Sequence, residues 1–182
     1  GFDGAGDGQI LRYDYSLGDF AFAVSLEQTN NGAETGLTGD ADPGELVYGI
    51  GFRYGVDVGG GVRLNFGLGY QACDNCDIVG ASVDARFDNG LRAILNYSQE
   101  SVDTAAEDTD RIGFAIGYSI DALTIAANYG NIDDGTTDTT GYGAVINYDL
   151  GGGAEVQFGV GNTDADGADD VTSYSLGLAL SF

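Results

Sequence analysis

The stretch LVYGIGFRYGVD at residues 46–57 alternates two kinds of side chain. One face is a row of Leu, Tyr, Ile, Phe, Tyr and Val, and the other carries Val, Gly, Gly, Arg, Gly and Asp. A period of two indicates a β-strand, because successive side chains point to opposite sides of a sheet. The stretch therefore predicts a strand with one apolar face and one face of small and polar residues.

The same alternation returns along the chain and predicts eleven strands. They are expected at residues 10–16, 19–27, 46–57, 62–71, 78–87, 91–98, 111–120, 123–130, 141–150, 154–161 and 171–182. Their connections alternate between short turns and long acidic links, which is typical of an up-and-down barrel with two chemically different ends. The predicted fold class is all-β, an antiparallel up-and-down transmembrane β-barrel, as a single domain over residues 1–182.

The charges are strongly unbalanced, with 6 Arg, 29 Asp and Glu, and neither Lys nor His among 182 residues. The net charge of −23 argues against a nucleic-acid partner, because binding phosphates needs a basic surface. Without His, the chain lacks the usual catalytic triads of hydrolases and the usual histidine ligands of zinc. We therefore expect neither an enzyme nor a nucleic-acid-binding protein.

An apolar face alone does not separate a soluble sandwich from a membrane barrel. The aromatic side chains of that face gather at both ends of the expected strands, with Ile, Leu, Val and Ala between them. Two such girdles around an aliphatic band are typical of a barrel that crosses a membrane. All six Arg fall on the opposite face, which suits both alternatives equally. The aromatics lie near the short turns (Tyr15, Phe20, Phe22, Phe52, Tyr54, Phe87, Tyr118, Tyr148, Phe182) and near the long links (Tyr48, Tyr70, Tyr97, Tyr129, Tyr142, Tyr174).

Three stretches resemble the sixteen-stranded general diffusion porins, particularly their alphaproteobacterial branch. These are TSYSLGLALSF ending at Phe182, GQILRYDYSLGDFAFAVSLEQ from Gly8, and YDLGGGAEVQFGVG from Tyr148. The resemblance implies a porin of the bacterial outer membrane, with a water-filled pore for passive diffusion of ions and small hydrophilic solutes. It also implies a homotrimer, contacts with outer-membrane lipid and lipopolysaccharide, and no required cofactor.

The odd strand number predicts that the chain is part of a longer barrel, because single-chain bacterial barrels have even numbers of strands. At about 17 residues per strand, sixteen strands need roughly 270 residues, so about 90 N-terminal residues and five strands are expected to be missing. The family pattern makes residues 1–9 the tail of the loop that folds into the pore and constricts it. The missing N-terminal segment of the same barrel is then an expected partner.

The face opposite the aromatics is expected to line the pore, where the charge of the wall sets ion selectivity. Four Arg on neighbouring strands, Arg53, Arg63, Arg86 and Arg92, are expected to form a basic strip. In the resembling porins such a strip faces acidic residues of the constriction loop. The alternative is that these Arg pair with carboxylates and keep the wall solvated. The complete expected lining is Arg12, Asp14, Arg53, Asp57, Arg63, Asn65, Asp84, Arg86, Arg92 and Arg111.

The long links hold most of the acidic residues, and two groups suggest Ca²⁺, because this ion prefers oxygen ligands. These groups are Asp133 with Asp134, and Asp164 with Asp166. Divalent ions would also bridge such loops to anionic lipopolysaccharide. No link has the EF-hand spacing, so solvated loops are the alternative.

Cys73 and Cys76 form a CDNC motif in one link and predict a local disulfide. A redox motif would need a helix N-terminus, and zinc would need four ligands where the chain offers two Cys and no His.

A second class of protein fits the composition, namely a soluble or secreted Asp/Gly-rich calcium-binding β protein or adhesin. Calcium rolls repeat a GGxGxDx nonapeptide, which GFDGAGDG at residues 1–8 only echoes. A protein of this class would stay folded without detergent, whereas a porin would need detergent and conduct ions in a bilayer.

Overall fold

The chain folds into eleven β-strands in a computed structural model, which describes residues 9–28 and 46–181. The strands are β1 (Gln9–Leu17), β2 (Phe20–Gln28), β3 (Leu46–Gly59), β4 (Val62–Ala72), β5 (Cys76–Phe87), β6 (Leu91–Val102), β7 (Thr109–Ile120), β8 (Leu123–Asp133), β9 (Asp138–Gly151), β10 (Ala154–Ala165) and β11 (Val171–Leu180). The prediction of eleven strands is confirmed. Of the expected constriction-loop tail at residues 1–9, Gln9 belongs to β1, while residues 1–8, the link at 29–45 and Phe182 lie outside the described residues.

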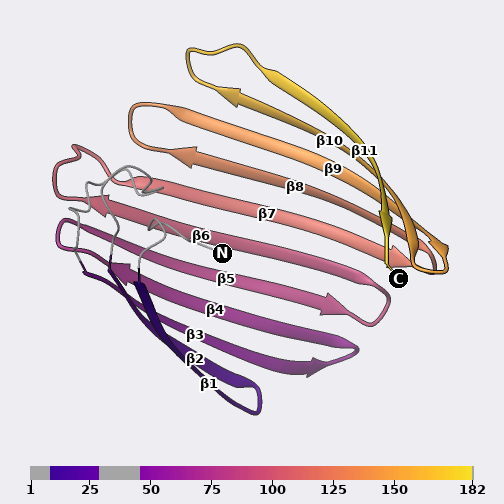
Figure 1. Cartoon of the computed structure of the whole chain (residues 1–182), viewed down its shortest axis with the longest axis horizontal. Helices are drawn as coiled ribbons and strands as arrows, with labels where there is room; N and C mark the ends of the chain where they lie inside the picture. The colour runs from indigo at the N-terminus through magenta and orange to yellow at the C-terminus, as the bar shows by residue number, and fades with distance from the viewer. Residues whose placement is uncertain (1–8, 29–45, 182) are drawn as a thin grey trace.

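All eleven strands form one antiparallel sheet in chain order. Each strand pairs with the strands before and after it in the sequence, so the predicted up-and-down topology is confirmed. Figure 1 shows the strands side by side, with the short turns at their right-hand ends and the described long links at their left-hand ends. Within the described ranges no helix has the length and apolar character needed to cross a membrane.

The strands reach further toward the long links than the side-chain alternation predicts. β6 continues to Val102 and β7 begins at Thr109, which adds rungs such as Gln99 opposite Asp110. Ladder hydrogen bonds come from the backbone, so a polar segment continues a hairpin once its register is set. Side-chain alternation ends the expected strands too early, because it recognises a strand only where every second residue is apolar.

The register sorts the side chains onto two faces of different chemistry. On the outer face, Tyr54 lies opposite Phe66 across β3 and β4. On the polar face, the next rung pairs Gly55 with Asn65. The outer face stays bare within the described part of the chain, and Leu176 is 79% exposed. A soluble sandwich would bury such a face against a second sheet, so a bare apolar face of this extent favours contact with lipid.

Two short turns depend on special backbone conformations. Gly90 closes the β5–β6 turn with a φ of 90°, and a Cβ added there would lie 2.0 Å from the carbonyl oxygen of Ser119. The carbonyl of Gly90 also accepts a hydrogen bond of 3.0 Å from the backbone N–H of Ser119. Asp121 takes a φ of 51° in the β7–β8 turn, a region that Asp tolerates better than most residues. The first of these turns is therefore tied directly to the end of β7.

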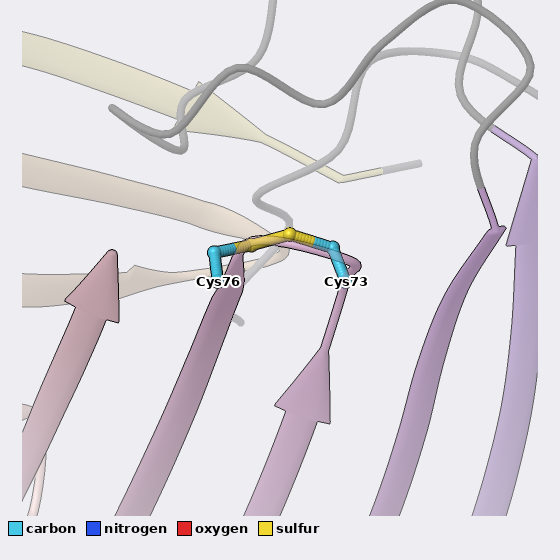
Figure 2. The surroundings of a disulfide bond; sticks show 2 residues. All are labelled: Cys73 and Cys76. Atoms are coloured by element: carbon cyan, nitrogen blue, oxygen red, sulfur yellow. A yellow bond between two sulfur atoms is a disulfide. The ribbon is translucent and has the colours of Figure 1, made fainter. Parts of the chain in front are cut away.

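The link between β4 and β5 is closed by a disulfide between Cys73 and Cys76, whose Cα atoms are 5.0 Å apart (Figure 2). The backbone N–H of Cys73 donates to the carbonyl of Cys76 at 2.8 Å. The backbone N–H of Asp103 donates to the carbonyl of Asn75 at 2.9 Å, and Cys76 and Ile78 form a small buried cluster. The disulfide link is thus joined to the link between β6 and β7.

Candidate functional site

The polar face of β1 to β6 is hollowed, and most of the expected pore-lining residues face this hollow. They are Arg12, Asp14, Arg53, Arg63, Asn65, Asp84, Arg86 and Arg92. Asp57 contacts Arg63, and Arg111 faces a second hollow over β6 to β11. Glycines on the same face, such as Gly51 opposite Gly69, leave room between the charged side chains. The polar face can therefore hold water and small solutes along the sheet.

Arg63 is the centre of a first group of three charges, which we call the Arg63 triad (Asp19, Arg63, Asp57). Its Nη2 donates to Oδ1 of Asp19 at 2.5 Å, and its Nη1 donates to Oδ2 of Asp57 at 2.8 Å. Asp19 comes from the β1–β2 turn and Asp57 from β3, so one guanidinium on β4 joins three separate elements. The triad carries two negative charges and one positive charge, a net charge of −1.

Asp84 is the centre of a second group, which we call the Asp84 triad (Arg86, Asp84, Arg92). Its Oδ1 accepts a hydrogen bond of 2.8 Å from Nε of Arg92. Its Oδ2 accepts from Nε of Arg86 at 2.9 Å and from Nη2 of Arg92 at 3.1 Å. The carboxylate is only 16% exposed, so both of its oxygens are occupied and largely shielded from water. With two guanidiniums and one carboxylate, this triad has a net charge of +1.

Both triads lie at the short-turn end of the polar face. Arg63 follows the β3–β4 turn by two residues, and Arg86 and Arg92 flank the β5–β6 turn in the same way. Arg63 lies directly opposite Arg86, which in turn lies opposite Arg92. The three Arg therefore do form a continuous row, but the three Asp balance it, since 3 − 3 = 0. These three Arg therefore pair with carboxylates, which is the alternative to an uncompensated basic strip that the sequence left open.

Arg53 differs from the other five Arg, because it has no carboxylate partner among the described residues. It lies on β3 between Ala21 and Gly67, whose side chains offer no charge. On β1, by contrast, Arg12 donates to both carboxylate oxygens of Asp14 at 2.8 Å. Arg53 is thus an uncompensated positive charge in the described wall.

A buried ion pair lies nearer the long links. Nη2 of Arg111 on β7 donates to Oε2 of Glu100 on β6 at 2.5 Å, and Glu100 is only 1% exposed. Its other oxygen, Oε1, is buried and has no hydrogen-bond partner in the described part of the chain, and the same holds for Oγ of Ser98. Glu100 was not expected on the polar wall, because the alternation placed it in a link. The sequence does hold a clue to this placement: Glu100 follows Ser98 by two positions, so the two residues share the polar face if the strand continues.

Three of the four acidic residues suggested for Ca²⁺ accept hydrogen bonds from backbone N–H groups. Oδ1 of Asp134 accepts from the N–H groups of Thr136 at 2.9 Å and Thr137 at 2.7 Å, and these hydrogen bonds lower the pKa of Asp134. Asp133 accepts from the N–H of Gly135 at 2.8 Å. Of the second group, Asp166 accepts a 3.3 Å hydrogen bond from the backbone of Asp138, and Asp164 lies at the end of β10. No cluster of three or more metal-ligating side chains occurs in residues 9–28 and 46–181, so Ca²⁺ binding stays a prediction.

Comparisons with known proteins point in one direction. The sequence profile described as Gram-negative porin matches residues 1–168. The chain is 25% identical to a porin of Rhodobacter capsulatus, over 98% of this chain and 63% of that protein. The chain therefore spans less than two thirds of that relative's length.

Solved structures show the same fold. A porin refined at 1.8 Å superposes with a TM-score of 0.70 at 22% identity, over 98% of this chain and 63% of the other. OccAB4 of Acinetobacter baumannii gives a TM-score of 0.73 at 13% identity, over 94% of this chain and 51% of the other. A mutant porin of Rh. blastica gives 0.69 at 19% identity, over 95% and 55%. The resemblance drawn from the three sequence stretches is confirmed at the level of fold and family.

Proposed function

This chain belongs to the Gram-negative porin family, whose members reside in the bacterial outer membrane, and from that premise we propose that it forms part of the wall of a water-filled pore. Ions and small hydrophilic solutes would cross this pore by passive diffusion. The chain would act as a channel and not as an enzyme.

The contrast between the two faces of one sheet is the observation that carries the proposal. The outer face exposes large apolar side chains, such as Phe52 on β3 and its register partner Leu68 on β4. The polar face is hollowed and carries all six Arg. A sheet with lipid on one side and water on the other needs this division, since an Arg facing lipid at the bilayer centre costs about 2–4 kcal/mol.

Selectivity would follow from the width of the pore and the charges of its wall. The triads neutralise each other, and Arg12 is paired with Asp14. Among the six Arg, the field of Arg53 is cancelled least by the described residues, because no described carboxylate forms an ion pair with it. We assign Arg53 the role of attracting anions and repelling cations.

The same proposal extends to the partners of the chain. Its outer face would contact lipid and, near the long links, lipopolysaccharide, with divalent ions between the acidic links and that anionic surface. The rest of the pore wall would come from a further segment of the same barrel, since the relatives are longer than this chain. The assembled form would be a homotrimer.

Single-channel recording in planar bilayers tests the pore and the role of Arg53 together. The full-length protein should give discrete conductance steps in KCl. In a KCl gradient, Arg53→Gln should move the reversal potential toward cation selectivity, while Arg53→Lys, which keeps the charge, should hold it near the wild-type value. Absence of conductance steps would refute the pore, whereas an unchanged reversal potential in Arg53→Gln would remove only the role of Arg53.

A further inference from the structure

We propose that the Arg63 triad and the Asp84 triad together bind small zwitterions, solutes of the α-amino acid class that carry one ammonium and one carboxylate. This proposal rests on the proposed pore and names a class of solute that its short-turn end would favour. It concerns a contact site on the wall, separate from the charge selectivity assigned to Arg53.

The Arg63 triad leaves acceptors free for an ammonium group. Arg63 uses one nitrogen for each carboxylate and thus occupies one oxygen of Asp19 and one of Asp57. The remaining oxygens, Oδ2 of Asp19 and Oδ1 of Asp57, have no partner among the described residues. The Asp57 side chain is 73% exposed, so a solute can contact it without any movement of neighbouring side chains. Two carboxylates around one guanidinium therefore present an excess of acceptors and a net negative charge.

The Asp84 triad leaves donors free for a carboxylate group. Arg86 uses only Nε, and Arg92 uses Nε and Nη2, to bind Asp84. Each guanidinium has five N–H donors, so several still point away from Asp84. The Arg86 and Arg92 side chains are 57% and 49% exposed, while Asp84 between them is 16% exposed. The shielded carboxylate thus fixes the guanidiniums in place and leaves their outer edges to a solute.

The two triads are direct neighbours on the sheet. Arg63 and Arg86 are register partners on β4 and β5, and adjacent strands lie about 4.8 Å apart. Asp19, Arg63, Asp84, Arg86 and Arg92 border one hollow. An acceptor-rich group with a charge of −1 thus adjoins a donor-rich group with a charge of +1, at the scale of a small molecule.

This arrangement favours a zwitterion over a simple ion. The six side chains sum to zero charge, so a lone anion or cation gains from one triad and is repelled by the other. A zwitterion gains from both, because its ammonium meets the free carboxylate oxygens while its carboxylate meets the free guanidinium N–H groups. Exposed contacts of this kind are individually weak, which suits a site that must release its solute.

The test compares the entry of L-threonine and erythritol into proteoliposomes that carry the full-length protein, measured as swelling rates. The two solutes are similar in size, but only threonine is zwitterionic. The test variant combines Asp57→Asn with Arg92→Gln, which removes one outer charge from each triad and keeps the net charge. The matched control combines Arg12→Gln with Asp14→Asn, which removes one exposed charge of each sign from the same face and also keeps the net charge.

We expect the threonine-to-erythritol ratio to fall roughly two- to tenfold in the test variant, the range that two exposed charge contacts can supply. The control variant should keep the wild-type ratio. A second variant, Asp19→Asn with Arg86→Gln, removes the other two outer charges and should lower the ratio similarly, so it decides the question if the first variant fails to insert. A wild-type ratio in an inserted test variant would overturn the zwitterion site and leave the pore in place. No erythritol entry with the wild-type protein would overturn the pore and the site with it.

Discussion

Gly90 offers a sharp test of how the short-turn end of the sheet is held together. The substitution Gly90→Ala adds one methyl group at a residue with a φ of 90°. That methyl carbon would lie 2.0 Å from the carbonyl oxygen of Ser119, a backbone atom of the neighbouring hairpin. Because neither partner is a flexible side chain, the β5–β6 turn must move away from β7. The hydrogen bond of 3.0 Å from the Ser119 N–H to the Gly90 carbonyl would then be weakened or lost.

The expected cost has three parts. A residue with a side chain held at positive φ costs about 1–3 kcal/mol. The loss of one backbone hydrogen bond adds about 0.5–1.5 kcal/mol. Restricting the unfolded chain by replacing Gly with Ala returns about 0.4–1 kcal/mol. The free energy of unfolding should therefore fall by about 0.5–4 kcal/mol in Gly90→Ala, with a central value of about 2 kcal/mol.

The matched control is Gly18→Ala in the β1–β2 turn. Gly18 also has a positive φ, 59°, but an added Cβ there meets no atom within 4 Å. This variant should lose only about 1 kcal/mol, since it has the backbone cost without the collision. Urea titrations of folded protein in lipid vesicles, followed by far-UV circular dichroism, give both values. Equal losses in the two variants would refute the role of the Ser119 contact.

Three further predictions concern the links and the buried ion pair. Replacing Cys73 and Cys76 together by Ser should lower the free energy of unfolding by about 2 kcal/mol, the loop-closure value for so short a loop, and the urea midpoint of the wild type should fall equally under reductant. The Asp134 carboxyl should titrate below its ordinary range in a carbon-13 NMR titration, because hydrogen bonds from the backbone N–H groups of Thr137 and Thr136 lower its pKa. These hydrogen bonds stabilise the folded state fully above the unfolded-state pKa. The stabilisation is lost as the pH falls through the lower folded-state pKa. Arg111→Leu should lower the free energy of unfolding by about 3–5 kcal/mol, because it leaves Glu100 buried without its partner. The double variant with Glu100→Leu should recover most of that loss. Losses that simply add in the double variant would show that the two residues are not coupled.

The sequence was sufficient to predict the strands because each of them carries its own periodic signal. Alternation around Phe52 identifies β3 without any knowledge of its neighbours, and the Gly-rich segment after Asp57 marks its end. The alternation of short turns with long links then fixes the chain order of the sheet. What the alternation missed were the polar rungs beyond it, such as those that carry Glu100, because backbone hydrogen bonds extend a hairpin without an apolar side chain.

The contacts of the site could not be read in the same way. Which carboxylate meets Arg63 depends on the register between strands, and its partner Asp19 is 44 residues away in a turn. Residue type and face alone placed Asp57 in the expected lining and left Asp19 out. A shift of one residue in any strand would move its side chains to the other face, so pairing is a property of the whole sheet. The face on which a side chain lies can be predicted from its own strand, whereas the carboxylate that pairs with an Arg depends on the neighbouring strands.

This distinction changes what the charges of the chain imply for transport. The net charge of −23 and the row of Arg suggest strong opposing fields, yet the row is neutralised at contact distance by Asp19, Asp57 and Asp84. Fields of exposed charges fade over about 8–10 Å at physiological salt, so the acidic links attract cations near their own end and act weakly at the short turns. A solute in the described wall would therefore meet long-range attraction at the long links, the unpaired positive charge of Arg53, and direct hydrogen bonding at the two triads. Raising the salt concentration should weaken the first two effects more than the third, since hydrogen-bond contacts are screened least.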